Sequence, residues 1–235
     1  MLVLARGCGV PIRTTGRAGD ALALVVYVLG FSFAYRSLNA GIGALILFAA
    51  VQFTMFGGAL IQGEILPPRR WLGAGLAFAG LVWLLWPGGS APLPLEGAAL
   101  MGTAGFGWGV YSLRGRTAQE PGAQDPVART AANFVLAAPV ALVVLGLTGR
   151  GEVSAAGLLL AVVSGALTSG LGYALWYRVL AGLQASVAAV AQLTVPVIAM
   201  AGGLVLLGEV PNLRVVLAAL LVLGGVGWSL RPKAV

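Results

Sequence analysis

Long apolar runs joined by short connectors dominate this chain and leave few ways to fold it. Only 9% of its residues are charged, whereas a soluble domain carries about 25%, so the sequence cannot build a water-exposed surface. A bilayer span needs about 20 mostly apolar residues, and no run alternates apolar with polar residues as an outer-membrane strand does. We predict an all-α, polytopic membrane protein with eight transmembrane helices. The spans are expected at residues 21–38, 40–62, 70–87, 95–113, 128–148, 154–176, 184–207 and 213–230, with Asn212 as the N-cap of the last.

The positions of Lys and Arg indicate the orientation, because cytoplasmic loops carry the excess of these residues. If residue 1 lies inside and the spans alternate, 11 of the 14 basic residues fall on the cytoplasmic side. Arg36, Arg150 and Arg214 fall outside. The pattern predicts a multi-pass protein of the cell membrane with both termini in the cytoplasm.

The chain also contains one stretch twice. A shift of 145 residues places Gly43–Leu85 on Ala188–Leu230 without a gap. Such repeats are sought first, because overlooking one misassigns the whole fold. The informative matches are Met55 with Met200, Glu64 with Glu209, Arg69 with Arg214, Trp83 with Trp228, Gly57-Gly58 with Gly202-Gly203, and Gly63 with Gly208.

The two copies are predicted to cross the membrane in opposite directions. The span at 40–62 is the second and its copy at 184–207 is the seventh, an odd number of spans apart, so the repeat is of the inverted kind found in secondary transporters. We expect two domains, residues 1–88 with three helices and residues 95–232 with five. Counterparts of the first two helices of the second copy would precede residue 1, so we expect the first repeat to be truncated.

Several short motifs recur in a fixed order along the chain. They are Phe33–Arg36, Gly41–Gln52 and Gly63-Glu64 in the first half, and Gly170–Arg178, Ala185–Gly208 with its Thr194–Val197, and Gly208-Glu209 in the second. Together these motifs resemble those of the drug/metabolite transporter superfamily, in particular its EamA-type members. The resemblance covers residues 20 to 232 and implies a transporter whose full form has two five-helix repeats; it favours export as the direction. In the family the first two helices help to line a central cavity.

Polar and aromatic residues inside the spans are the candidates for lining a substrate pathway. An amide without a partner in hydrocarbon costs several kcal/mol, so the amides must face protein or water. The alternative for any one of these residues is a hydrogen bond between helices, worth about 0.6 kcal/mol on average. For a single residue this alternative accounts for the polar group as well as substrate contact does. As a set they suggest a pathway for small amphipathic metabolites. The candidates are Gln52, Trp108, Tyr111, Ser112, Asn133, Ser164, Thr168, Tyr173, Gln192 and the helix-kinking Pro196.

The carboxylates all lie near helix ends or in connectors, not in mid-membrane where an ionisable group suggests an ion relay. Glu64 and Glu209 remain the candidate coupling carboxylates. The alternative for both is an interfacial carboxylate beside the Arg of the following helix, Arg69 or Arg214. Glycines at Gly105-xxx-Gly109, Gly57-Gly58 and Gly224-Gly225 are predicted to let helices approach closely.

Other chemistries find little support in the composition. The chain has no His and one Cys, so we expect no enzyme, no metal and no other cofactor. The basic residues lie in connectors, so we expect no nucleic-acid partner despite the net charge of +7. The expected partners are the lipid bilayer and a small-molecule substrate, and a homodimer is left open.

The function predicted from these features is transport of small metabolites or drug-like compounds by alternating access between the two inverted repeats. The alternative is a non-transporting truncated remnant, or a membrane scaffold that needs a partner chain to supply the missing helices.

Overall fold

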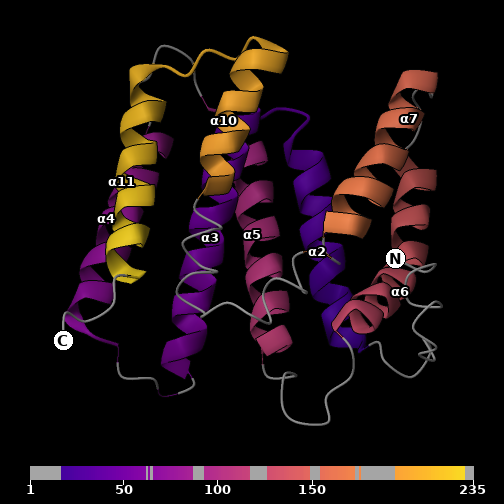
Figure 1. Cartoon of the computed structure of the whole chain (residues 1–235), viewed down its shortest axis with the longest axis horizontal. Helices are drawn as coiled ribbons and strands as arrows, with labels where there is room; N and C mark the ends of the chain where they lie inside the picture. The colour runs from indigo at the N-terminus through magenta and orange to yellow at the C-terminus, as the bar shows by residue number, and fades with distance from the viewer. Residues whose placement is uncertain are drawn as a thin grey trace. The chain divides into compact units, whose positions relative to one another are not determined.

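The structure is a computed structural model of the whole chain. It describes residues 17–61, 63, 66–86, 93–116, 126–148, 154–172, 175 and 194–230. The regular secondary structure among these residues is all helical, as predicted. The elements are α2 (Ala18–Ala34), α3 (Ala40–Ile61), α4 (Pro68–Leu85), α5 (Leu95–Arg116), α6 (Pro126–Thr148), α7 (Ala155–Val163), the π-helical η2 (Ser164–Leu171), α10 (Thr194–Leu207) and α11 (Leu213–Leu230) (Figure 1).

The helix starts follow from local sequence. Asn212 caps α11, since its side-chain oxygen accepts a hydrogen bond of 3.0 Å from the Val215 N–H, which confirms that predicted N-cap. Ser154 caps α7 in the same way. Pro68 is the first residue of α4, a position where the missing N–H is not needed.

Two described helices, Ala40–Ile61 and Ala128–Thr148, are long and apolar enough to cross a membrane by length and composition. Four shorter apolar helices accompany them: Ala18–Ala34, Ala155–Ser169, Thr194–Leu207 and Leu213–Ser229. Many large apolar side chains on these helices are exposed, such as Leu147, Leu160 and Leu206. So many exposed large apolar side chains are typical of a helical membrane protein.

The chain divides into two compact units, residues 1–25 with 114–184, and residues 26–113 with 185–235. In the first unit the start of α2, the end of α5 and α6 are tied by polar contacts. Asp20 is buried, and its carboxylate accepts a 2.5 Å hydrogen bond from Arg114. The buried Asn133 of α6 accepts a bond of 3.2 Å from the Arg17 N–H.

The second unit holds the apolar core, to which α3, α5 and α11 contribute most of the buried residues. Small residues let these helices approach each other. A Cβ added at Gly105 would lie 2.6 Å from the Ala50 Cβ, and one at Gly109 would lie 2.5 Å from the Thr54 Cβ. Close packing was predicted at both glycines and is confirmed. It is also confirmed at Gly58 and Gly225, whereas Gly57 and Gly224 face open space among the described residues.

In the second unit the helices related by the 145-residue shift lie side by side and run antiparallel, α3 with α10 and α4 with α11 (Figure 1). Gly203 near the end of α10 lies against Ala40 at the start of α3. Gly73 near the start of α4 lies against Ser229 near the end of α11. A glycine in the left-handed region follows α3 and α10 alike, Gly63 at φ +75° and Gly208 at φ +68°.

The contact between α4 and α11 is reciprocal under the same shift. The neighbours of Gly80 are three residues of α11, and the neighbours of Gly225 are the three corresponding residues of α4. Such reciprocity is what a two-fold axis produces at an isologous contact. Gly80 meets Ala218, Leu221 and Val222, and Gly225 meets Gly73, Leu76 and Ala77.

Candidate functional site

A cavity of about 420 Å³ lies in the second unit, where the starts of α3, α5 and α11 meet the ends of α4 and α10. Its volume falls in the range of about 300–1,000 Å³ that is usual for small-molecule sites. The wall is mostly apolar with a few polar side chains. It consists of Asn39, Gly41, Ile42, Leu84, Leu85, Trp86, Leu93, Pro94, Leu95, Met200, Glu209, Val210, Pro211, Asn212, Arg214 and Val215.

Glu209 forms one polar corner of this cavity and caps a neighbouring helix. One carboxylate oxygen accepts a hydrogen bond of 2.9 Å from the Ala40 N–H at the start of α3. A helix N-terminus carries partial positive charge, so a carboxylate there is stabilised. Gly203 makes the contact possible, because a Cβ at that position would lie 2.5 Å from the carboxylate oxygen.

Arg214 is the second charged residue of the cavity wall, and it caps the C-terminus of a helix. Its Nε and Nη2 donate to the Trp83 carbonyl oxygen at 2.9 and 2.8 Å, and Nη2 also donates to the Trp86 carbonyl. These carbonyls end α4, where partial negative charge favours a cation. Both cavity charges are therefore engaged with main-chain groups of α3 and α4.

A ladder of five aromatic rings runs along α2 and α5 in the same unit. Tyr111 and Trp108 have centroids 5.8 Å apart, and Tyr27 lies 4.9 Å from Trp108. Phe31 lies 5.6 Å from Tyr27, and Tyr35 lies 4.7 Å from Phe31. The Trp108–Tyr111 pair is stacked and the Phe31–Tyr35 pair is edge-to-face, which are favoured arrangements of aromatic rings; the two pairs with Tyr27 are tilted.

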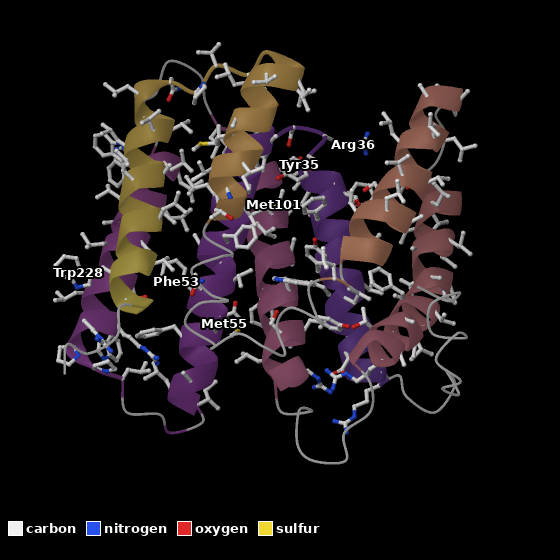
Figure 2. The ribbon with its side chains drawn as sticks, in the orientation of Figure 1. Tyr35, Arg36, Phe53, Met55, Met101 and Trp228 are labelled. Carbon is white, nitrogen blue, oxygen red and sulfur yellow. The ribbon has the colours of Figure 1, made fainter. Side chains whose placement is uncertain are left out.

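The ladder ends beside the cavity. The Tyr35 hydroxyl donates a hydrogen bond of 3.2 Å to the Ala40 carbonyl, and the residues on either side of Ala40 line the cavity. Figure 2 labels Tyr35 and Met101, and both side chains pack over Gly43. One hydrogen-bonded residue, Ala40, thus separates the last ring of the ladder from the cavity wall.

The structure places two predicted pathway residues, Trp108 and Tyr111, in this ladder. Ser112, one residue on, bonds back to the Trp108 carbonyl. Gln52 is half-buried on α3 and is not part of the cavity wall. Glu209 is the predicted carboxylate that lines the cavity.

The other described candidates lie elsewhere. Pro196 is buried, and it is the third residue of the described helix α10. Asn133 belongs to the first unit and makes the hydrogen bond with Arg17. Ser164 and Thr168 are exposed in η2, where the Thr168 hydroxyl bonds the Ser164 carbonyl. Tyr173, Gln192 and Glu64 lie outside the described residues. A part in transport remains a prediction for every residue of the set.

The sequence reasoning missed Tyr27, Phe31 and Tyr35, although a signal was present. They recur every four residues in the first predicted span, and residues four apart share one face of a helix. It also missed that Asn39, Trp86 and Asn212 would line one cavity, because helix ends that are distant in sequence come together only through tertiary packing. Among the residues that the structure describes, no three His, Cys, Asp or Glu side chains gather as metal ligands would.

A model of the EamA-like transporter family matches residues 95–231. The chain belongs to the EamA-like transporter family. This confirms the resemblance found in the sequence motifs, and with it membership of the drug/metabolite transporter superfamily. Members of the EamA-like family are integral membrane proteins that act as transporters.

One relative of this EamA-like chain is an uncharacterized protein, PA1977 of Pseudomonas aeruginosa. It is 47% identical over 234 residues, which cover 99% of this chain and 79% of the relative. No solved structure shows a significant match to the chain. The comparisons therefore establish the family and leave the substrate to be inferred from the site.

Proposed function

We propose that the chain exports small amphipathic metabolites across the cell membrane by alternating access between two inverted repeats. The observation that carries the proposal is the cavity, which is walled by the ends of helices from both copies of the repeat. Its apolar wall suits an apolar body, and Asn39, Asn212, Glu209 and Arg214 supply a few polar contacts, the usual composition of a small-molecule site.

Two features of the packing support inverted repeats. The helices related by the 145-residue shift run antiparallel, and the contact between Gly80 and α11 repeats as the contact between Gly225 and α4. Inverted repeats place substrate sites at the interface of the two halves. With both termini in the cytoplasm, as the Lys and Arg distribution predicts, the cavity faces the outside, because the connectors around it follow the first, third and seventh spans.

The energy source consistent with this proposal is an ion or substrate gradient. The sequence contains no P-loop for nucleotide hydrolysis. Glu209 stands as the candidate coupling carboxylate on the described part of the chain. Its bond to Ala40 favours a structural role as well, and a proton would have to compete with that bond.

The test is transport by the purified full chain in liposomes. Vesicles are preloaded with a mixture of labelled small amines, carboxylic acids, zwitterions and neutral aromatic compounds, and release is followed by mass spectrometry. We expect release of at least one class above the rate of protein-free vesicles. Release of none, from protein that is correctly inserted, would refute transport and favour a membrane scaffold.

A matched pair of variants connects any release to the cavity. Val210 is 80% exposed and borders the cavity, whereas Val205 is 79% exposed and does not. Val210→Trp narrows the mouth and should slow release several-fold. Val205→Trp adds the same ring away from the mouth and should leave the rate unchanged. Equal rates in both variants would place the pathway elsewhere.

A further inference from the structure

The pattern Gly-x4-Gly-Glu-x4-Arg occurs once in each copy of the repeat. The first occurrence runs from Gly58 to Arg69 and the second from Gly203 to Arg214. We call each pattern a clamp, and the structure shows what each residue of the second clamp does. Gly203 provides space, Gly208 turns the chain at φ +68°, and Glu209 holds the start of α3.

Arg214 completes the second clamp by bonding the main chain at the end of α4. Its guanidinium donates to the carbonyls of Trp83 and Trp86 at the end of α4. Glu209 and Arg214 together therefore join the second copy to the start of α3 and the end of α4. Hydrogen bonds from a charged donor are stronger than neutral ones. The four residues therefore fix the relative position of the two copies at this end.

Arg69, the counterpart of Arg214, is in a different state. Its Nε atom is buried and, among the described residues, has no hydrogen-bond partner. A buried donor left unpaired is destabilising, so such an atom calls for an explanation. Gly63 of the first pattern nonetheless has a left-handed backbone, at φ +75°, as Gly208 has in the second.

An acceptor for Arg69 lies where the repeat places it. Arg69 precedes Gly73 by one helical turn, and Gly73 packs against Ser229 near the end of α11. The contact between α4 and α11 is reciprocal, so the counterpart of the Trp83 carbonyl is the carbonyl of Trp228. A carbonyl oxygen has two lone pairs and accepts a second donor.

We infer that Arg69 and Arg214 are alternating clamps, each fastening one end of the α4–α11 pair in one of the two transport conformations. The structure holds the conformation with the Arg214 clamp made and the Arg69 clamp released. In the other conformation Arg69 bonds the Trp228 carbonyl, and Arg214 leaves the end of α4. This inference rests on the proposed function, since alternating access requires two such conformations.

The experiment measures the conformational balance without substrate. Cys8, the single cysteine of the chain, is replaced by Ser, and Leu85→Cys in the cavity wall becomes the probe. The rate at which a polar maleimide labels this cysteine in purified protein reports the cavity conformation seen here. Arg214 lines the cavity and Arg69 does not.

Arg214→Gln should slow labelling about tenfold, since loss of a charged donor's bonds shifts an equilibrium by roughly that factor. A purely local effect has the opposite sign, because a shorter side chain widens the cavity and speeds labelling. Adding Arg69→Gln to Arg214→Gln should return the rate toward that of the parent, because both clamps are then lost. Arg70→Gln, the same charge change one residue along, should not restore it.

The inference is overturned if Arg214→Gln labels at or above the parent rate, or if the double variant stays as slow as the single one. Should Arg214→Gln fail to fold, Gly203→Ala displaces Glu209 and tests the same clamp, with Gly202→Ala as its control because a Cβ there meets nothing within 4 Å. Slow labelling by Gly203→Ala that Arg69→Gln relieves supports the clamps; normal labelling refutes them.

The two proposals fail separately. Clamp exchange without release from liposomes would refute the transport function and leave a two-state membrane protein. Release from liposomes without clamp exchange would refute the alternating clamps alone.

Discussion

Substituting Gly225 tests the close contact of α4 and α11 at its tightest point. A Cβ on Gly225 would lie 2.6 Å from the Gly73 carbonyl oxygen and 2.8 Å from the Ala77 nitrogen. Both atoms belong to the backbone of the facing helix, so no side chain can rotate out of the way. Gly225→Ala must push the two helices apart by several tenths of an ångström and loosen the neighbouring contacts.

The neighbouring glycine supplies the control. A Cβ on Gly224 meets nothing within 4 Å among the described residues. Both substitutions gain the same helix propensity, about 0.8–1 kcal/mol for Ala over Gly, so this gain cancels in the comparison. What remains is the overpacking penalty at Gly225, about 1–3 kcal/mol in a packed core.

The measurement is thermal unfolding of the two purified variants in detergent, followed by tryptophan fluorescence. We expect Gly224→Ala to unfold at or above the parent temperature and Gly225→Ala to unfold several degrees below Gly224→Ala. Equal midpoints, or a higher midpoint for Gly225→Ala, would refute a close contact between these helices and the reciprocity built on it.

Three further outcomes are expected. Arg114→Gln should lower the unfolding free energy by about 1–3 kcal/mol, because it removes the partner of the buried Asp20 carboxylate. Asp20→Asn should cost less because Arg114 is half exposed; the reverse order in thermal unfolding would contradict the burial seen here. Trp108→Ala should slow transport several-fold with normal membrane insertion, since it removes a ring from within the aromatic ladder. Trp71→Ala, outside the ladder, should not slow transport. Equal activity of the two variants in flux assays would show that the ladder is not part of the pathway. Reporter fusions should place both chain ends in the cytoplasm, and an external C-terminal reporter would overturn the orientation.

Much of the fold follows from the sequence because apolar runs of bilayer length have one stable form, the helix. The predicted spans at 40–62, 70–87 and 213–230 agree with α3, α4 and α11 to within two residues at each end. The first span was placed too late, at 21–38, because residues 18–20 are polar or small; the helix instead begins at Ala18 and pairs Asp20 with Arg114. The ion pair joins residues far apart in sequence, and no local pattern reveals it.

The site was less accessible to sequence reasoning. Single polar residues in the spans drew attention, and Trp108 and Tyr111 do belong to an aromatic ladder. The cavity, however, forms from helix ends and connectors, where polar residues are common and carry little information individually. Glu209 had two interpretations. Its carboxylate accepts a hydrogen bond from the Ala40 N–H at the start of α3, a contact that no local pattern reveals, and its part in ion coupling stays a prediction.

The glycine contact between α4 and α11 also has a mechanical consequence. Ala77 lies at the middle of this contact, and Arg69 is eight residues away on the same helix, about 12 Å at 1.5 Å per residue. If the helices tilt against each other about this point by roughly 15°, a rotation of the size seen in other switching proteins, the helix ends move about 3 Å. A hydrogen bond does not survive that displacement, whereas contacts at the pivot hardly change. The contact thus acts as a pivot between α4 and α11, and its glycines keep the two helix axes close enough at that point for both helix ends to move.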